Sequence, residues 1–179
     1  MEFSNLIEAR RSIRVYKSGT TIEKSVIEEI IGAAQKAPSW KNSQTGRYYV
    51  IMSADKVEFI RNKCLPEFNQ KNSANAPVFI VTAFEKSISG FDNDGNSVNE
   101  IGDEWGAYDL GLQNENLILK ARELGLDTLI MGIRDAEILR SELSIPDTQE
   151  IVAVIALGYR NIEPNAPKRK DIDEIVSFF

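Results

Sequence analysis

Two clusters of basic side chains near the ends of the chain have the residue types that bind anions. Residues 10–14 read Arg-Arg-Ser-Ile-Arg, and residues 168–170 read Lys-Arg-Lys. Guanidinium groups bind phosphate oxygens through paired hydrogen bonds, and a serine hydroxyl can complete the set of ligands. These clusters predict a phosphate site if the two ends of the chain meet. The alternative is two solvated basic patches that pair with nearby acids.

A second unusual segment, residues 37–44, reads Ala-Pro-Ser-Trp-Lys-Asn-Ser-Gln. It places amides, small polar groups and an indole between an expected helix and an expected strand. Such a loop can present hydrogen-bond donors and an aromatic face to a planar ligand. The alternative is a capped turn whose Trp40 folds back on the core.

Several kinds of catalytic site are excluded by what the sequence lacks. The chain has no histidine, which excludes Ser-His-Asp and Cys-His catalysis and zinc sites built on imidazole. The single cysteine, Cys64, excludes an internal disulfide and any CxxC motif. Neither a GxGxxG nor a GxxxxGK[ST] motif is present. The segment Asp92–Asn96 resembles a calcium loop, but its glycine is misplaced, so we expect a turn. If the protein is an enzyme, we therefore expect its reactive chemistry to lie on a bound cofactor.

Length and composition indicate one soluble globular domain over residues 1–179. The chain has 21 Lys and Arg against 27 Asp and Glu, a net charge of −6, which argues against nucleic acid as a partner. No apolar run approaches the ~18 residues of a membrane span, and the first residues do not form a signal peptide. With one cysteine, the composition is typical of a cytoplasmic protein.

Hydrophobic patterning predicts alternating helices and strands. We expect a helix capped by Ser4, a helix that opens with a Thr20/Glu23 capping box and ends before Pro38, and a helix capped by Ser53. A helix of about 20 residues from Glu104 is apolar on more than one face, which indicates a buried position with Gly125 just beyond its end. A short helix is expected over 135–143 and a helical or extended tail over 171–178.

Strands are expected at 47–53, 77–84, 127–133 and 151–157. The second is a continuous apolar run, which is typical of a strand covered on both faces. Residues 85–103 are polar and predict a long exposed loop. The order of elements predicts an α/β or α+β layer structure around a mixed sheet.

Together the motifs resemble the nitroreductase family of FMN-dependent oxidoreductases. The chain matches the family's Arg-x-Ser-x-basic motif at residues 10–14 and its Pro-Ser-x-x-Asn-x-Gln loop at 38–44. It also matches the pattern of the family's long helix, at Asp109, Gly111, Asn114 and Leu117, and then Gly125-Leu126-Asp127-Thr128, Met131-Gly132, Ala-Leu-Gly-Tyr at 156–159 and the basic tail at 168–170. The resemblance implies an α+β fold with a mixed, mostly antiparallel sheet flanked by helices. It also implies a homodimer that holds each FMN at the subunit interface, with the long buried helix in that interface.

The resemblance also implies roles for particular residues. Arg10 and Arg169 would hold the FMN phosphate, with Arg11 and either Lys168 or Lys170 as helpers, and Ser12 would bind the ribityl or phosphate region. At the pyrimidine edge of the flavin the implied residues are Arg14, Lys71 and either Asn69 or Gln70. Backbone at Met131 and Gly132 would approach flavin N5. The second chain would supply the loop residues Pro38, Ser39, Trp40, Asn42 and Gln44.

The activity implied is hydride transfer from NADH or NADPH through flavin N5 to a nitroaromatic, a quinone or a similar flat acceptor, with ping-pong kinetics. No side chain need act as a nucleophile or a metal ligand. Trp40, Trp105 and the 85–103 loop would shape the acceptor pocket. The alternatives are an FMN-binding protein without this turnover, an enzyme of the same fold that dehalogenates its substrate or modifies flavin, or a flavin-free acidic interaction protein.

Overall fold

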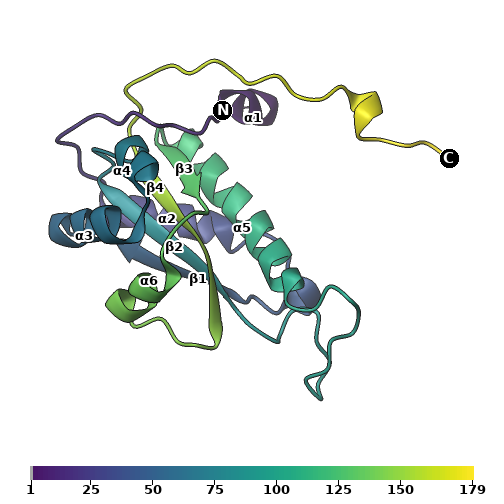
Figure 1. Cartoon of the computed structure of the whole chain (residues 1–179). Helices are drawn as coiled ribbons and strands as arrows, with labels where there is room; N and C mark the ends of the chain where they lie inside the picture. Colours follow the sequence, from purple (N-terminus) through teal and green to yellow (C-terminus); the bar gives the residue numbers. More distant parts are fainter. Residues whose placement is uncertain (1) are drawn as a thin grey trace.

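A four-stranded antiparallel sheet forms the centre of the molecule. The computed structural model describes residues 2–179, and the strands lie in the order β1-β2-β4-β3 (Figure 1). They are β1 (Gly46–Ile51), β2 (Val78–Glu85), β3 (Asp127–Met131) and β4 (Gln149–Gly158). All three strand pairs are antiparallel, and an isolated parallel bridge joins Ser12, outside the sheet, to Thr128 of β3. The α+β prediction is confirmed.

The central strand β2 is buried on both faces, as its apolar run predicted. Phe79, Val81 and Ala83 belong to one hydrophobic cluster, whereas Val78 and Ile80 belong to a second cluster on the opposite face. Because successive side chains of a strand point to opposite faces, one strand supplies both halves of the core.

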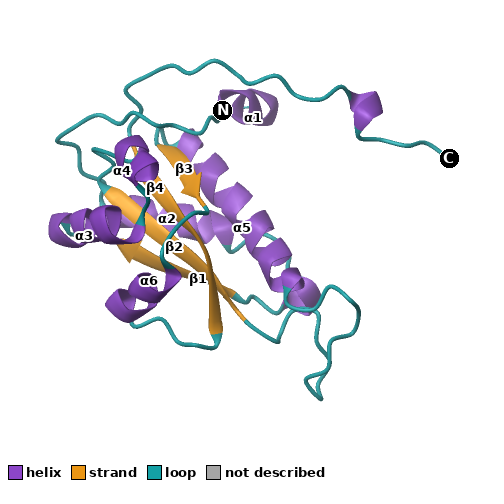
Figure 2. Cartoon of the chain, in the orientation of Figure 1, coloured by secondary structure: helices purple, strands orange, loops and turns teal. Residues whose placement is uncertain are grey.

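Helices cover the two faces of this sheet (Figure 2). The helices α2 (Lys24–Ala34) and α5 (Glu104–Glu123) contact each other and contribute to the cluster around Ile80. On the other face, α3 (Ala54–Cys64) packs with α6 (Ala136–Leu143), and α4 (Glu67–Asn72) contacts α3. The short helix α1 (Phe3–Ala9) and two 3₁₀ turns, η1 (Trp40–Asn42) and η2 (Ile172–Glu174), complete the described part.

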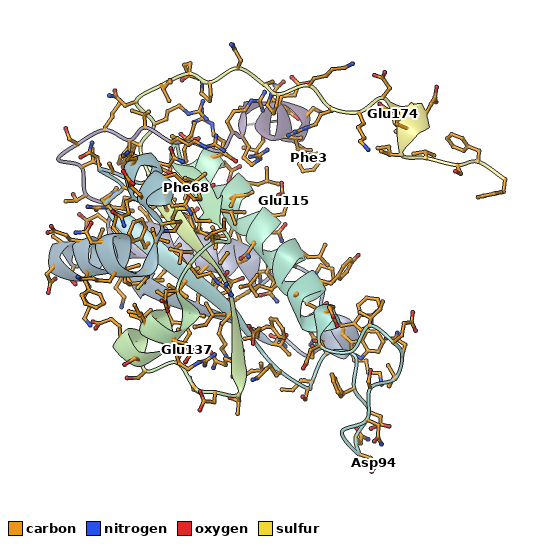
Figure 3. All side chains as sticks on the ribbon, viewed as in Figure 1. Phe3, Phe68, Asp94, Glu115, Glu137 and Glu174 are labelled. Atoms are coloured by element: carbon orange, nitrogen blue, oxygen red, sulfur yellow. The ribbon has the colours of Figure 1, made fainter. Side chains whose placement is uncertain are left out.

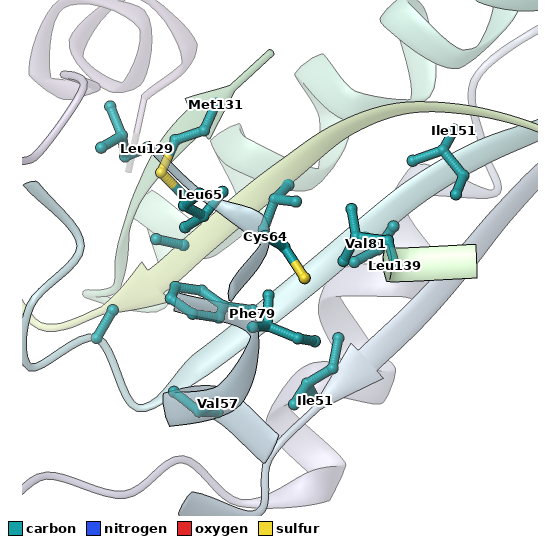
Figure 4. Packing of buried hydrophobic residues seen from close by; sticks show 14 of the residues in the cluster. Ile51, Val57, Cys64, Leu65, Phe79, Val81, Leu129, Met131, Leu139 and Ile151 are labelled. Carbon is teal, nitrogen blue, oxygen red and sulfur yellow. The ribbon is translucent and has the colours of Figure 1, made fainter. Parts of the chain in front are cut away.

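Cys64 lies within the core on the α3 face, beside Phe79 and Leu139 (Figure 4). Its side chain is buried, and this burial raises the pKa of the thiol to about 11. The thiol therefore stays protonated near neutral pH and acts as a small apolar side chain.

The predicted helix starts are wrong in detail. Ser4 lies inside α1, whose N-cap is Glu2. The Thr20 hydroxyl donates to the carbonyl of Lys17, 3.2 Å away, and α2 begins only after Glu23, so the capping box does not form. Ser53 occupies the N-cap of α3 but makes no side-chain cap hydrogen bond. These helices are instead fixed by their buried faces.

The long helix α5 begins at Glu104, as predicted, and Gly125 follows it with a φ of +80°. The amide of Leu126 donates to the carbonyl of Ala121, which closes a glycine-dependent C-cap. The expectation of burial on more than one face holds only in part, because Tyr108, Gly111 and Glu115 remain exposed along one side (Glu115 is labelled in Figure 3).

Other segments differ less from expectation. The 85–103 segment is a loop, as predicted, although Ser89 and Gly90 within it are buried. Asp92 accepts hydrogen bonds from the amides of Asp94 and Asn96, which confirms the predicted turn. The α4 helix was not predicted. Within residues 2–179, no helix combines the length and the apolar character that crossing a membrane requires.

Candidate functional site

The two basic clusters meet at one cavity of about 330 Å³. The segment after β4 runs past α1 (Figure 1), and so brings residues from both ends of the sequence together. The cavity is lined by Arg10, Arg11, Ser12, Arg14, Pro164, Asn165, Pro167 and Arg169. Four of these side chains are guanidinium groups, and no carboxylate in the described chain lines the cavity. The lining therefore favours an anion with several oxygens.

Residues 10–14 are positioned by backbone pairing on two sides. The amide of Ile13 donates to the carbonyl of Thr128 on β3, and the amide of Asn161 donates to the carbonyl of Val15. Ile13 is fully buried, whereas the adjacent Ser12 and Arg14 are exposed. This alternation is the geometry of an extended segment, and it turns the polar residues of the motif toward the cavity.

A buried ion-pair cluster fixes the chain beside the cavity. Asp127, which is 2% exposed, pairs with Arg160 at 2.5 Å and with Arg122 at 3.1 Å. The hydrogen bond to Asp127 raises the pKa of the Arg160 guanidinium, and the same guanidinium donates to the carbonyl of Ala9 at 3.1 Å. Arg160, at the start of the C-terminal segment, therefore holds together β3 and Ala9, the residue that precedes Arg10.

A second cavity, of about 350 Å³, adjoins β3. It shares Arg14 with the basic cavity, and its other lining residues are Phe68, Asn69, Asn72, Leu129, Ile130, Met131, Gly132 and Ile133. Phe68, Ile130 and Ile133 are largely exposed apolar side chains (Phe68 is labelled in Figure 3). A Cβ added to Gly132 would meet no atom within 4 Å, so the space beside this glycine is open. The two cavities therefore offer a cationic site and, beside it, a site lined by both polar and apolar groups.

On α4 the structure brings Asn69, not Gln70 or Lys71, to this second cavity. The buried Asn69 amide donates to the carbonyl of Ile133 at 3.3 Å. Gln70 donates to the carbonyl of Leu65 at 2.8 Å, and Lys71 pairs with Glu67 at 2.7 Å. Neither of these two side chains lines the cavity in this chain.

The 38–44 segment forms a strained, well-anchored turn. Lys41, Asn42 and Gln44 have φ values of +47°, +57° and +51°, which cost about 1 kcal/mol or more each for residues other than glycine. The Ser39 hydroxyl oxygen accepts from the amide of Gln44 at 3.0 Å. Strain of this kind is typical of ligand-binding segments.

The buried carboxylate of Asp109 on α5 anchors the same turn. It accepts from the amide of Trp40 at 2.9 Å and from the hydroxyl of Ser89 at 2.8 Å. The Ser89 hydroxyl also lies 2.8 Å from the hydroxyl of Ser43. A single side chain of α5 therefore joins the 38–44 turn to the 85–103 loop.

Aromatic side chains gather at this end of α5. The rings of Trp40 and Trp105 lie 4.9 Å apart, and those of Trp105 and Tyr108 lie 5.5 Å apart. The buried indole nitrogen of Trp40 has no hydrogen-bond partner among residues 2–179.

The 38–44 turn and the basic cavity lie near opposite ends of α5. Asp109, which anchors the turn, lies thirteen residues from Arg122, or about 20 Å along the helix axis. Within one chain, the predicted loop residues Pro38, Ser39, Trp40, Asn42 and Gln44 therefore lie apart from the basic cavity.

Only one of the three basic residues predicted near the carboxyl end lines the basic cavity. Arg169 lines the basic cavity, whereas Lys168 and Lys170 do not. Sequence reasoning missed Phe68, Asn72, Pro164, Asn165 and Pro167. The spacing of Asn69 and Asn72, three residues apart on a helix, could have indicated a shared face. Residues 2–179 contain no group of three or more His, Cys, Asp or Glu side chains placed to hold a metal ion.

The model of the Nitroreductase family matches residues 7–159 of the sequence. The chain belongs to the nitroreductase family. It is 30% identical over 167 residues to an Archaeoglobus fulgidus protein provisionally named NADH dehydrogenase/NAD(P)H nitroreductase, covering 88% of this chain and 85% of that protein. It is 26% identical over 205 residues to the Bacillus subtilis protein MhqN, provisionally named an NAD(P)H nitroreductase, covering 99% of this chain and 98% of MhqN.

Solved structures of this family share the fold. A protein of Exiguobacterium sibiricum 255-15, provisionally described as a nitroreductase and crystallised in complex with FMN, superposes with a TM-score of 0.87 at 20% identity. The alignment covers 100% of this chain and 98% of that structure. This nitroreductase-family chain is accordingly an oxidoreductase with the nitroreductase fold.

Proposed function

We propose that this chain is an FMN-dependent oxidoreductase that takes reducing equivalents from NADH or NADPH and passes them to a flat acceptor, such as a nitroaromatic or a quinone. The observation that carries the proposal is the convergence of residues 10–14 and Arg169 on one cationic cavity, which shares Arg14 with a second cavity beside β3. FMN has the matching shape, because it joins a phosphate to a planar ring. When bound, FMN supplies two-electron transfer between donor and acceptor.

The phosphate end of FMN fits the residues of the basic cavity. Arg10 and Arg169 make no side-chain hydrogen bond or ion pair within the described chain, so their donors are available to a ligand. Arg11 donates to the carbonyl of Arg10 at 2.7 Å, which holds this neighbouring guanidinium in place. We assign Arg10 and Arg169 as the principal phosphate ligands, with Ser12 and Arg11 beside them. Lys168 stays a weaker candidate.

The ring end fits the second cavity. Arg14 would place a positive charge at the pyrimidine edge of the ring, where it stabilises negative charge that accumulates on reduction. Asn69, which lines the cavity, is a better candidate for this edge than Gln70 or Lys71. Backbone at Met131 and Gly132 would flank the ring, since no side chain occupies the space beside Gly132.

We also propose that the active form is a homodimer in which the partner supplies the 38–44 turn. The turn is strained and anchored, yet it lies at the far end of α5 from the basic cavity. The exposed side of α5, with Tyr108, Gly111 and Glu115, offers a surface along which a second copy could run antiparallel. Such an arrangement would bring each turn to the other chain's cavities. Trp40, Trp105 and the 85–103 loop would then border the acceptor. The single free cysteine suits a reducing compartment, which supports a cytoplasmic location.

Titration of the apoprotein with FMN tests the phosphate assignment directly. Each charge-assisted contact contributes about 1.5–3 kcal/mol, so Arg10→Ala with Arg169→Ala should weaken FMN binding by about two orders of magnitude or more. Lys170→Ala is the matched control, because it removes a neighbouring charge that does not line the cavity, and it should bind FMN nearly as well as the unaltered protein. An unchanged FMN affinity in the double variant would disprove the assignment.

Turnover tests the activity. The purified protein should show the visible absorption of bound flavin, and NADH or NADPH should bleach it rapidly under anaerobic conditions. Steady-state rates at several fixed acceptor concentrations should give parallel double-reciprocal lines. Bound flavin that neither donor reduces would favour an FMN-binding protein instead, and a colourless protein that takes up no FMN would contradict both readings.

A further inference from the structure

A separate cavity of about 510 Å³ lies between α3 and the segments that lead into α2 and β2. None of its lining residues lines either of the two cavities assigned to FMN. Its size falls within the range of small-molecule sites, about 300–1,000 Å³. Much of its wall is apolar, including the side chains of Ile22, Met52, Val57, Ala76 and Val78.

The cavity is lined by a guanidinium that makes no hydrogen bond or ion pair with residues 2–179. Of the ten arginines, only Arg10, Arg61 and Arg169 make no side-chain hydrogen bond or ion pair within residues 2–179. Arg10 and Arg169 lie in the basic cavity, and Arg61 lies in this one. The Nε atom of Arg61 is buried and unsatisfied, and its Cζ atom lies 6.0 Å from the centroid of the Phe79 ring. Because the Nε atom is shut off from solvent, a ligand in the cavity would be bound by the two Nη atoms of Arg61, which also make no hydrogen bond or ion pair within residues 2–179.

Neighbouring groups restrict the charge of that ligand. Thr21 and Asn75 line the same cavity, and their side chains make no hydrogen bond to any described residue, so both can donate to a bound oxygen. Glu58, one helical turn before Arg61, also lines the cavity but does not pair with it. A carboxylate beside the guanidinium repels a dianion more strongly than a monoanion. Glu58 therefore limits the ligand to at most one negative charge, and Arg61 is the group that would attract that charge to an otherwise apolar molecule.

We propose that this cavity binds a small monocarboxylate with an apolar body, held by a fork of hydrogen bonds from Arg61 to its two carboxylate oxygens. The planar guanidinium matches the carboxylate in this bidentate geometry. The apolar wall around Val57, Ala76 and Val78 would cover the rest of the molecule. The site is distinct from the proposed flavin site, because it shares no lining residue with the two cavities assigned to FMN.

Titration with benzoate, followed by NMR of methyl-labelled protein as purified, tests this site. Benzoate should shift the methyl signals of Val57, Ala76 and Val78 and leave the visible spectrum of bound FMN unchanged. Arg61→Gln should weaken benzoate binding about tenfold or more, since one charge-assisted contact is lost. Lys63→Gln, which removes an exposed charge from the same helix, should leave the affinity unchanged.

Three results would overturn the proposal: methyl signals that do not move at millimolar benzoate, equal affinity in Arg61→Gln, or equally tight binding of the uncharged analogue benzamide. If Arg61→Gln does not fold, Arg61→Lys keeps the charge without the fork and should lose part of the affinity. The methyl shifts of the unaltered protein do not require FMN. Failure of the proposed oxidoreductase activity would therefore leave this test intact.

Discussion

The carboxylate of Asp127 should contribute more to stability than any other single charge beside the basic cavity. It is 2% exposed and accepts three hydrogen bonds, from Arg160 Nε at 2.7 Å, from Arg160 Nη2 at 2.5 Å and from Arg122 Nη1 at 3.1 Å. The side chains of Arg160 and Arg122 are only 12% and 20% exposed. In the variant Asp127→Asn, two mostly buried guanidinium groups would face a neutral amide.

Removing one partner from a buried ion pair costs about 3–5 kcal/mol. The entropy of unfolding is about 2.1 cal/mol/K per residue, or about 0.38 kcal/mol/K for 179 residues. The expected fall in Tm is therefore about 8–13 °C, measured by circular dichroism on apoprotein. Glu163→Gln is the matched control, because Glu163 pairs with the same Arg160 at 2.8 Å but is 84% exposed. This control should change the stability by less than about 1 kcal/mol.

The same variant should also weaken FMN binding, because Arg160 holds the carbonyl of Ala9 next to Arg10. A fall in Tm of less than about 3 °C, or one equal to that of Glu163→Gln, would refute the claim that the buried carboxylate organises this region. If Tm falls by the expected amount but the FMN affinity is unchanged, the claim that Arg160 positions Arg10 for FMN binding would be refuted.

Three further predictions concern other parts of the core. Gly106→Ala should destabilise the protein by about 1–3 kcal/mol in urea denaturation, because the added methyl would lie 2.2 Å from Phe84 Cδ2. By contrast, Gly32→Ala within α2 should stabilise the protein by about 0.5–1 kcal/mol, because the added methyl would meet no atom within 4 Å. Asp109→Ala should cost about 2–4 kcal/mol by leaving two donors without their acceptor, and a loss below 1 kcal/mol would contradict its anchoring role. Cys64 should resist thiol reagents at pH 8 until the protein unfolds. Because its pKa is raised from 9.0 to about 11 in the native state, stability should fall as the pH rises through that interval, which pH-dependent denaturation would measure.

The sequence predicted the elements whose side chains carry a strong pattern. The apolar run at 77–84 became the doubly covered strand β2, and the 20-residue helix began at Glu104 as expected. The capping predictions at Ser4 and Thr20 were wrong, and Ser53 occupies the predicted N-cap position of α3 without the expected side-chain hydrogen bond. The Thr20 hydroxyl bonds to the carbonyl of Lys17 instead, a choice that a local sequence pattern cannot reveal. The α4 helix was missed because its six residues are too few to show a helical period.

That missed helix also explains the ambiguity in the candidate site. Consecutive residues on a helix point in directions about 100° apart, so Asn69, Gln70 and Lys71 cannot share one face. Without the helix, the sequence could not say which of the three lines the cavity. The family resemblance implied that Arg10 and Arg169 meet, but residue patterns alone could not establish it, because the meeting depends on Arg160, Asp127 and Ala9, which are far apart in the chain.

The extended carboxyl end has a practical consequence for handling the protein. After Arg160 the chain adds no strand and contributes nothing to either hydrophobic cluster, yet it carries Arg169 back to the cavity. A proteolytic nick between residues 161 and 168 would leave the sheet and its helices intact while detaching one of the groups assigned to the cofactor. A preparation clipped there would keep the fold of the sheet and its helices, and we expect it to bind the proposed FMN less tightly than the intact chain does.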